Sequence, residues 1–90
     1  DLPVEVECRS LLEVKEAIKA NVNRIMLDNM SEQEMKNALE LIPDHIESEI
    51  SGGVTLNNIA ALARLKPTYI SVGKLTLSAP AADFSMQIKG

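Results

Sequence analysis

Residues 24–34 of the chain read RIMLDNMSEQE, and this stretch decides the fold. Its apolar run ends in Asp28-Asn29, which predicts a short buried strand followed by a polar loop. Ser31 and Glu34 have the spacing of a capping box, so a helix should begin there. A strand that passes within a few residues into a helix is the unit from which parallel α/β sheets are built.

The same unit lies on the N-terminal side of this stretch. Val4–Cys8 alternates between apolar and acidic residues, as a half-buried strand does. Ser10 and Glu13 form another capping box, and the helix that they begin is expected to run to about Ala20. The helix of the central stretch should end at Pro43, because proline cannot continue a helix.

The pattern continues on the C-terminal side for two more strands. His45–Ile50 is the third predicted strand and Tyr69–Val72 the fourth. Between them, Thr55 should cap a third helix, which Pro67 closes. Phe84–Ile88 is expected to be a closing strand or a tail.

The predicted strands begin near positions 4, 24, 46 and 69 and so repeat roughly every 20 residues, the scale of (β/α) barrel units. Helices between the strands require right-handed crossovers and therefore a parallel sheet. Four βα units with a C-terminal tail make about half of an eight-stranded barrel; an open four-stranded sheet is the alternative. Half a barrel leaves two strand edges unpaired, and the chain starts at Asp1 without a Met. We therefore expect residues 1–90 to be part of a larger assembly, with the missing strands supplied by the same gene product or by another chain.

The composition argues against two classes of function. The net charge is −4, no basic stripe is present and the only aromatics are Tyr69 and Phe84, which argues against binding of nucleic acid. No apolar run approaches the roughly 20 residues of a membrane span. The single cysteine, Cys8, cannot form an internal disulfide and is expected to pack in the core, which fits a cytoplasmic protein.

Acidic residues stand where the first two strands end, which in parallel barrels is the edge that carries the active site. Glu7 shares a face of its strand with Glu5, because strand side chains alternate. This pair is either on an edge strand in water or compensated by a cation. Asp28 is either a turn residue or a carboxylate that holds Mg²⁺ or sugar hydroxyls.

Glycines break the chain after the next two strands. Ser51-Gly52-Gly53 precedes the third helix, and Gly73 follows the fourth strand. Backbone N–H groups beside glycines, together with a helix start, can form an anion nest. Loops after two consecutive late strands are the usual phosphate site of such barrels, while an ordinary glycine turn is the alternative interpretation of each loop alone.

Four segments in this order and spacing resemble the C-terminal half of quinolinate phosphoribosyltransferases. They are Val4–Cys8, Ile25–Met30, Ser51–Leu56 and Ile70–Thr76, and the ending Ala82–Met86 resembles that family's last segment. The resemblance implies that residues 1–90 are the C-terminal part of the (β/α) barrel domain of a larger enzyme, a glycosyltransferase of NAD biosynthesis that uses Mg²⁺. It would convert quinolinate and phosphoribosyl pyrophosphate to nicotinate mononucleotide, CO₂ and pyrophosphate, as a homodimer or higher oligomer.

The resemblance also assigns roles to individual residues. Glu7 and Asp28 would be catalytic, holding Mg²⁺ and the ribose hydroxyls. The 5-phosphate would be bound by two sets of residues, the second mainly through backbone N–H groups: Ser51, Gly52 and Gly53, then Val72, Gly73 and Lys74. Carboxylates suit a developing oxocarbenium-like sugar, and Mg²⁺ suits the pyrophosphate that leaves.

Two positions depart from the family pattern. Leu77 stands where many relatives carry a His near the phosphate, and Lys74 stands where a small or apolar residue is usual. The basic residues that grip the two carboxylates of quinolinate in the family come from upstream of the matching segments, so the 90 residues alone are expected to be inactive. A sister phosphoribosyltransferase with another acceptor, and a non-catalytic half-barrel, are the alternatives.

Overall fold

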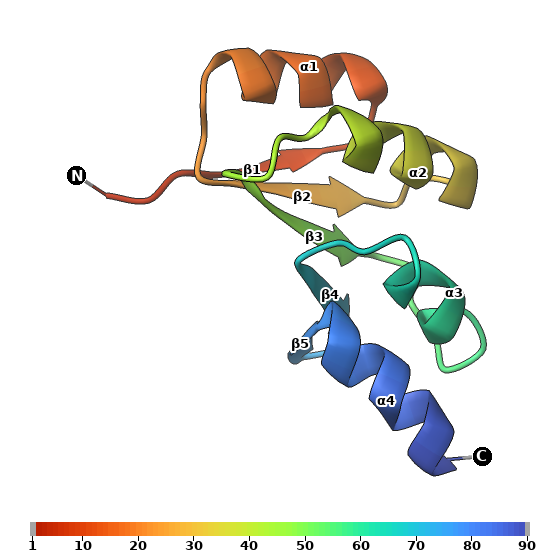
Figure 1. The fold of residues 1–90 in the computed structure, drawn as a ribbon. Helices are drawn as coiled ribbons and strands as arrows, with labels where there is room; N and C mark the ends of the chain where they lie inside the picture. Colours follow the sequence, from red (N-terminus) through yellow and green to blue (C-terminus); the bar gives the residue numbers. More distant parts are fainter. Residues whose placement is uncertain (1, 90) are drawn as a thin grey trace.

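The structure, a computed structural model, describes residues 2–89, with side chains described as far as Phe84. Strands and helices alternate along most of the chain (Figure 1). The elements are β1 (Glu5–Cys8), α1 (Leu11–Lys19), β2 (Arg24–Asp28), α2 (Glu32–Leu41), β3 (Glu47–Ser51), α3 (Ile59–Ala63), β4 (Tyr69–Val72), β5 (Leu75–Ser78) and α4 (Ala79–Lys89).

The strands form one five-stranded sheet in the order β1-β2-β3-β4-β5. The first four strands are parallel, and β5 pairs antiparallel with β4. Each parallel neighbour follows the previous strand through a helix, as in the units of a (β/α) barrel. The predicted α/β fold, with four parallel strands that make up part of a barrel, is therefore confirmed.

The first two helices begin where the sequence predicts. Ser10 is the N-cap of α1 and its Oγ accepts the backbone N–H of Glu13 at 3.2 Å. The box there is only half formed, because the Glu13 carboxylate accepts the N–H of Arg9 instead of that of the cap. In α2 the box is complete, with Ser31 and Glu34 satisfying each other's backbone N–H groups.

The helices lie on one side of the sheet, and the core lies between the two layers (Figure 1). The buried apolar side chains of the strands alternate with side chains of the opposite face, most of which are polar, as the period of two requires. The buried set that faces the helices includes Cys8, Ile25, Leu27, Ile50 and Ile70. The opposite face of the sheet carries acidic side chains, Arg24 and hydroxyl groups, so the site must be sought there and at the strand ends.

The third helix is shorter than predicted, and Thr55 is not its N-cap. α3 begins at Ile59, with Asn58 at the cap position and no side-chain cap bond. Thr55 Oγ1 accepts the N–H of Asn57 in the preceding turn. Asn58 bonds back to Thr55 N and to the carbonyl of Gly53, and such local bonds compete with the helix for the backbone.

The C-terminal prediction is wrong, because Phe84–Ile88 belongs to helix α4 and is neither a strand nor a tail. The chain reverses at Gly73, whose φ of +59° suits a tight turn, and returns as β5 beside β4. α4 then packs against α3, with Ala82 fully buried in the common core. Within residues 2–89, no helix has the length and apolar character needed to cross a bilayer.

Candidate active-site edge

The residues predicted for the site gather along one edge of the sheet, where β1 to β4 end. In the register of the parallel strands, Glu7 lies beside Met26, and Asp28 lies beside Ser51. We call Glu7 and Asp28 the carboxylate pair, Ser51–Gly53 the first glycine loop and Val72–Lys74 the second glycine loop. The fold thus places all eight predicted residues on the C-terminal ends of neighbouring strands.

A cation joins the carboxylate pair. Arg9, in the turn after β1, donates from Nη2 to Glu7 Oε1 at 3.1 Å and from Nε to Asp28 Oδ2 at 3.2 Å. The hydrogen bond to Asp28 and then the charge of Glu7 raise the pKa of the Arg9 guanidinium. The Arg9 side chain is 69% exposed, so water screens these ion pairs and another cation can take the place of the guanidinium. Sequence reasoning missed Arg9, whose only signal is a basic residue beside a strand-end carboxylate.

The first glycine loop lies directly against Asp28, one member of the carboxylate pair. The N–H of Asn29 donates to the carbonyl of Ser51 at 3.2 Å, so the backbone after β2 is bonded to the end of β3. A Cβ added to Gly52 would lie 2.6 Å from Asp28 Oδ1. Only a residue without a side chain fits between this backbone and the carboxylate.

The helix start expected beside this loop is not where the sequence placed it. A turn separates Gly53 from α3, and α3 has only five residues. The side chain of Asn58 instead donates to the Gly53 carbonyl at 2.9 Å and so ties the loop to the residue that precedes α3. Anion binding here would therefore use loop N–H groups, without the dipole of a long helix.

The second glycine loop is the tight turn between β4 and β5. Val72 is half-buried against the core, while Gly73 and Lys74 are exposed at the turn. Leu77, the departure from the family pattern, lies opposite Ile70 in the ladder and packs against the core. Leu77 therefore packs as part of the hydrophobic core in this chain.

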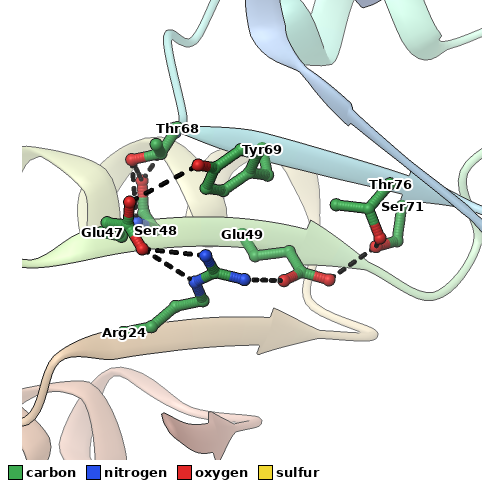
Figure 2. Close-up of polar contacts among 8 residues, drawn as sticks. All are labelled: Arg24, Glu47, Ser48, Glu49, Thr68, Tyr69, Ser71 and Thr76. Carbon is green, nitrogen blue, oxygen red and sulfur yellow. Dashed lines mark hydrogen bonds and ion pairs between the residues drawn. The ribbon is translucent and has the colours of Figure 1, made fainter. Parts of the chain in front are cut away.

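A second polar cluster, which the sequence did not reveal, lies on the same face toward the starts of β2 and β3 (Figure 2). Arg24 donates to Glu47 Oε1 from Nη2 at 2.8 Å and from Nε at 3.1 Å, and its Nη1 lies 3.4 Å from Glu49 Oε1. The hydrogen bond to Glu47 raises the pKa of Arg24. The guanidinium also lies 4.6 Å from the centre of the Tyr69 ring. The only hint in the sequence was the alternation of Glu47 and Glu49 on one strand face.

The carboxylate pair is the candidate position for Mg²⁺. Within residues 2–89, no group of three or more His, Cys, Asp or Glu side chains is placed to hold a metal by itself. Mg²⁺ does not need one, because it commonly takes one or two carboxylates together with water and substrate phosphates. Glu7 and Asp28, which both pair with Arg9, are the residues that could hold it.

A cavity of about 470 Å³ lies between α3 and the start of α4, lined by Ala63, Pro67 and Pro80 among others, and contains none of the predicted site residues. Its lining is mainly apolar and offers little to a phosphorylated sugar. The chemistry-bearing groups are those on the strand ends.

Comparison with known proteins agrees with this geometry. The chain matches the family described as "Quinolinate phosphoribosyl transferase, C-terminal domain" over residues 1–87. It is 40% identical over 102 residues to a chloroplastic nicotinate-nucleotide pyrophosphorylase (carboxylating) of Oryza sativa subsp. japonica, covering 97% of this chain and 28% of that protein. It is 39% identical over 90 residues to the enzyme of that name from Rattus norvegicus, covering 97% and 30%. A probable enzyme of the same name from Bacillus subtilis is 36% identical over 85 residues, covering 94% and 29%.

The chain spans less than a third of the length of these relatives. The match runs through every strand of the sheet and both glycine loops. The chain therefore belongs to the quinolinate phosphoribosyl transferase family, to the part described as its C-terminal domain.

Proposed function

We propose that the full-length protein converts quinolinate and phosphoribosyl pyrophosphate to nicotinate mononucleotide, CO₂ and pyrophosphate. In this proposal the present chain binds the ribose phosphate and Mg²⁺. The observation that carries the proposal is the contact between Asp28, one member of the carboxylate pair, and Gly52 of the first glycine loop. One sugar phosphate can contact a carboxylate and a phosphate-binding loop at once only if the two lie within the length of that molecule. In addition, relatives named for this reaction match nearly the whole chain.

In this proposal Glu7 and Asp28 hold Mg²⁺ and the ribose hydroxyls. Mg²⁺, when bound, neutralises the pyrophosphate that leaves. The two carboxylates face the sugar ring and stabilise positive charge as it develops there. Asp28 is the better placed of the two for a fixed role, because its side chain is 21% exposed against 51% for Glu7.

The 5-phosphate is bound by the two glycine loops. The two loops follow neighbouring strands, since β3 is paired with β4 as far as Ile50 and Ile70. The positive φ values of Gly52 and Gly73, +79° and +59°, turn the backbone at the strand ends and allow close approach of an anion. Lys74, exposed at the second loop, adds a positive charge.

A homodimer and a cytoplasmic location stay predictions. The name of the rice relative carries the word chloroplastic, and those of three Nicotiana relatives carry the word mitochondrial. The boundaries of the barrel domain likewise stay predictions from the sequence.

The test is release of labelled CO₂ from quinolinate by the full-length protein, with phosphoribosyl pyrophosphate and Mg²⁺. The variants Asp28→Asn and Glu7→Gln should lower kcat by at least about a hundredfold, as loss of transition-state electrostatics does. Glu5→Gln is the matched control, since Glu5 lies on the same face of β1 but away from the edge. Melting curves should show all three variants folded.

Absence of CO₂ release from the unmodified protein would contradict the proposed reaction. If the protein still bound phosphoribosyl pyrophosphate, a sister transferase with another acceptor would be indicated. Full turnover in Asp28→Asn would remove the role assigned to that carboxylate.

A further inference from the structure

Glu49 is the one charged residue that is buried among the side chains the structure describes. It lies in the middle of β3 and is 5% exposed. A buried carboxylate is costly unless it is hydrogen-bonded or paired, and removing one partner leaves that cost uncompensated. The partners of Glu49 are therefore held in place more firmly than those of a surface acid.

Those partners lie on the two neighbouring strands (Figure 2). Ser71 of β4 donates from Oγ to Glu49 Oε2 at 2.5 Å, and Arg24 of β2 approaches Glu49 Oε1 at 3.4 Å. Ser71 Oγ also lies 3.1 Å from Oγ1 of Thr76 on β5. One side chain of β3 thus connects strands on both sides of it.

The bond to Ser71 lies where the backbone ladder stops. β3 and β4 are paired only at Glu49–Tyr69 and Ile50–Ile70. Beyond that point the two strands run into the first and second glycine loops. Glu49 stands two residues before Ser51, and Ser71 directly precedes Val72. The side-chain bond between Glu49 and Ser71 therefore joins the strands just before the loops begin.

Side-chain hydroxyls also form hydrogen bonds at the other end of the same short ladder. Ser48 and Thr68 exchange two hydrogen bonds, each hydroxyl accepting the other residue's backbone N–H at 3.0 Å. Two hydroxyl contacts thus flank the ladder, one at its start and one at the site edge. Substituting each contact in turn can therefore separate a general effect on the pairing of β3 with β4 from an effect on loop position at the site.

We propose that Glu49, acting through Ser71, is a positioning residue that holds the second glycine loop against the first so that both bind one phosphate group. This inference rests on the proposed function, because it assigns the two loops to the 5-phosphate. Glu49 does not itself touch the substrate. Its effect is to fix the relative position of two backbone segments, and displacements of about 1 Å are costly in such sites.

The experiment measures steady-state CO₂ release by the full-length protein with varied phosphoribosyl pyrophosphate and, separately, varied quinolinate. Glu49→Ala removes a partner from both Arg24 and Ser71 and can fail to fold, so Ser71→Ala is the primary variant. It should raise the KM for phosphoribosyl pyrophosphate by about tenfold and leave the KM for quinolinate within about twofold of wild type. Ser71→Thr keeps the hydroxyl and should restore the KM.

Ser48→Ala is the matched control, the same substitution on the same strand pair. It removes the acceptor of the Thr68 N–H and should lower the melting temperature at least as much as Ser71→Ala, with an unchanged KM for phosphoribosyl pyrophosphate. An unchanged KM in Ser71→Ala, or an equal rise in Ser48→Ala, would overturn the positioning role while leaving the proposed function intact. No turnover by the wild type would overturn both.

Discussion

Gly52 and Asp28 are in direct contact across the ends of two neighbouring strands. The position that a Cβ of Gly52 would take is 2.6 Å from Asp28 Oδ1 and 3.1 Å from the backbone nitrogen of Asn29. The glycine therefore does more than permit a turn, because it leaves the space that the carboxylate occupies. A residue assigned to the sugar and metal and a residue assigned to the phosphate are thus parts of one packed unit.

A side chain at position 52 should disturb Asp28. Gly52 and Gly53 both have positive φ, +79° and +71°, so alanine at either position costs about 1–2 kcal/mol in backbone strain. A Cβ on Gly53 meets nothing within 4 Å, whereas one on Gly52 displaces the Asp28 carboxylate. Gly52→Ala should therefore lower the free energy of unfolding more than Gly53→Ala, as measured by urea denaturation. In an Asp28→Ala background the difference should shrink, and an unchanged difference would contradict the contact.

Removal of Arg9 should strengthen Mg²⁺ binding. The guanidinium bridges the two carboxylates proposed to hold the metal, so protein cation and metal compete. Because Arg9 is well exposed, the gain in Arg9→Gln should be modest, about two- to fivefold in affinity. Isothermal titration of the full-length protein with Mg²⁺ measures it, and Arg64→Gln, at the C-cap of α3, controls for the loss of one positive charge. Weaker binding in Arg9→Gln would show that Arg9 supports the metal site.

The cap of α2 should make stability depend on pH. The N–H of Ser31 donates to the Glu34 carboxylate, and this bond lowers the pKa of Glu34. A pKa that is lower in the folded state than in the unfolded state stabilises the fold above the unfolded value. That stability is lost as the pH falls through the folded value. The melting temperature of wild type should therefore fall toward that of Glu34→Gln between about pH 6 and pH 3. Glu40→Gln, on the same helix, controls for the removed charge, and a constant gap would contradict the prediction.

Cys8 should be inert toward alkylation in the folded protein. It is fully buried beneath α1, and burial, followed by the charge of Glu13, raises the pKa of its thiol. Since the thiolate is the reactive form, iodoacetamide should modify Cys8 at least about a hundredfold more slowly in the native protein than in guanidinium. Mass spectrometry of the peptide that contains Cys8 follows the reaction. Equal rates would show that β1 opens readily at the sheet edge.

Local chemistry was sufficient to predict the elements that depend on neighbouring residues. The capping box at Ser31 and Glu34 is complete, and the strand Tyr69–Val72 has the predicted bounds. The C-terminal segment was mistaken because its apolar residues suit a strand or a helix equally. The segment instead forms α4, whose Ala82 is buried in the core where α4 packs against α3, and no local pattern reveals that contact.

For the candidate site, too, some features follow from the sequence and others only from the fold. The sequence by itself determined which residues end the strands, because strand ends are marked by carboxylates and glycines: Glu7, Asp28, Ser51–Gly53 and Gly73. Only the tertiary structure decided that Arg9 bridges the carboxylate pair, that Gly52 contacts Asp28 and that Glu49 reaches Ser71. These contacts join residues about twenty apart in the chain, and they exist because parallel pairing brings consecutive strand ends to one edge of the sheet.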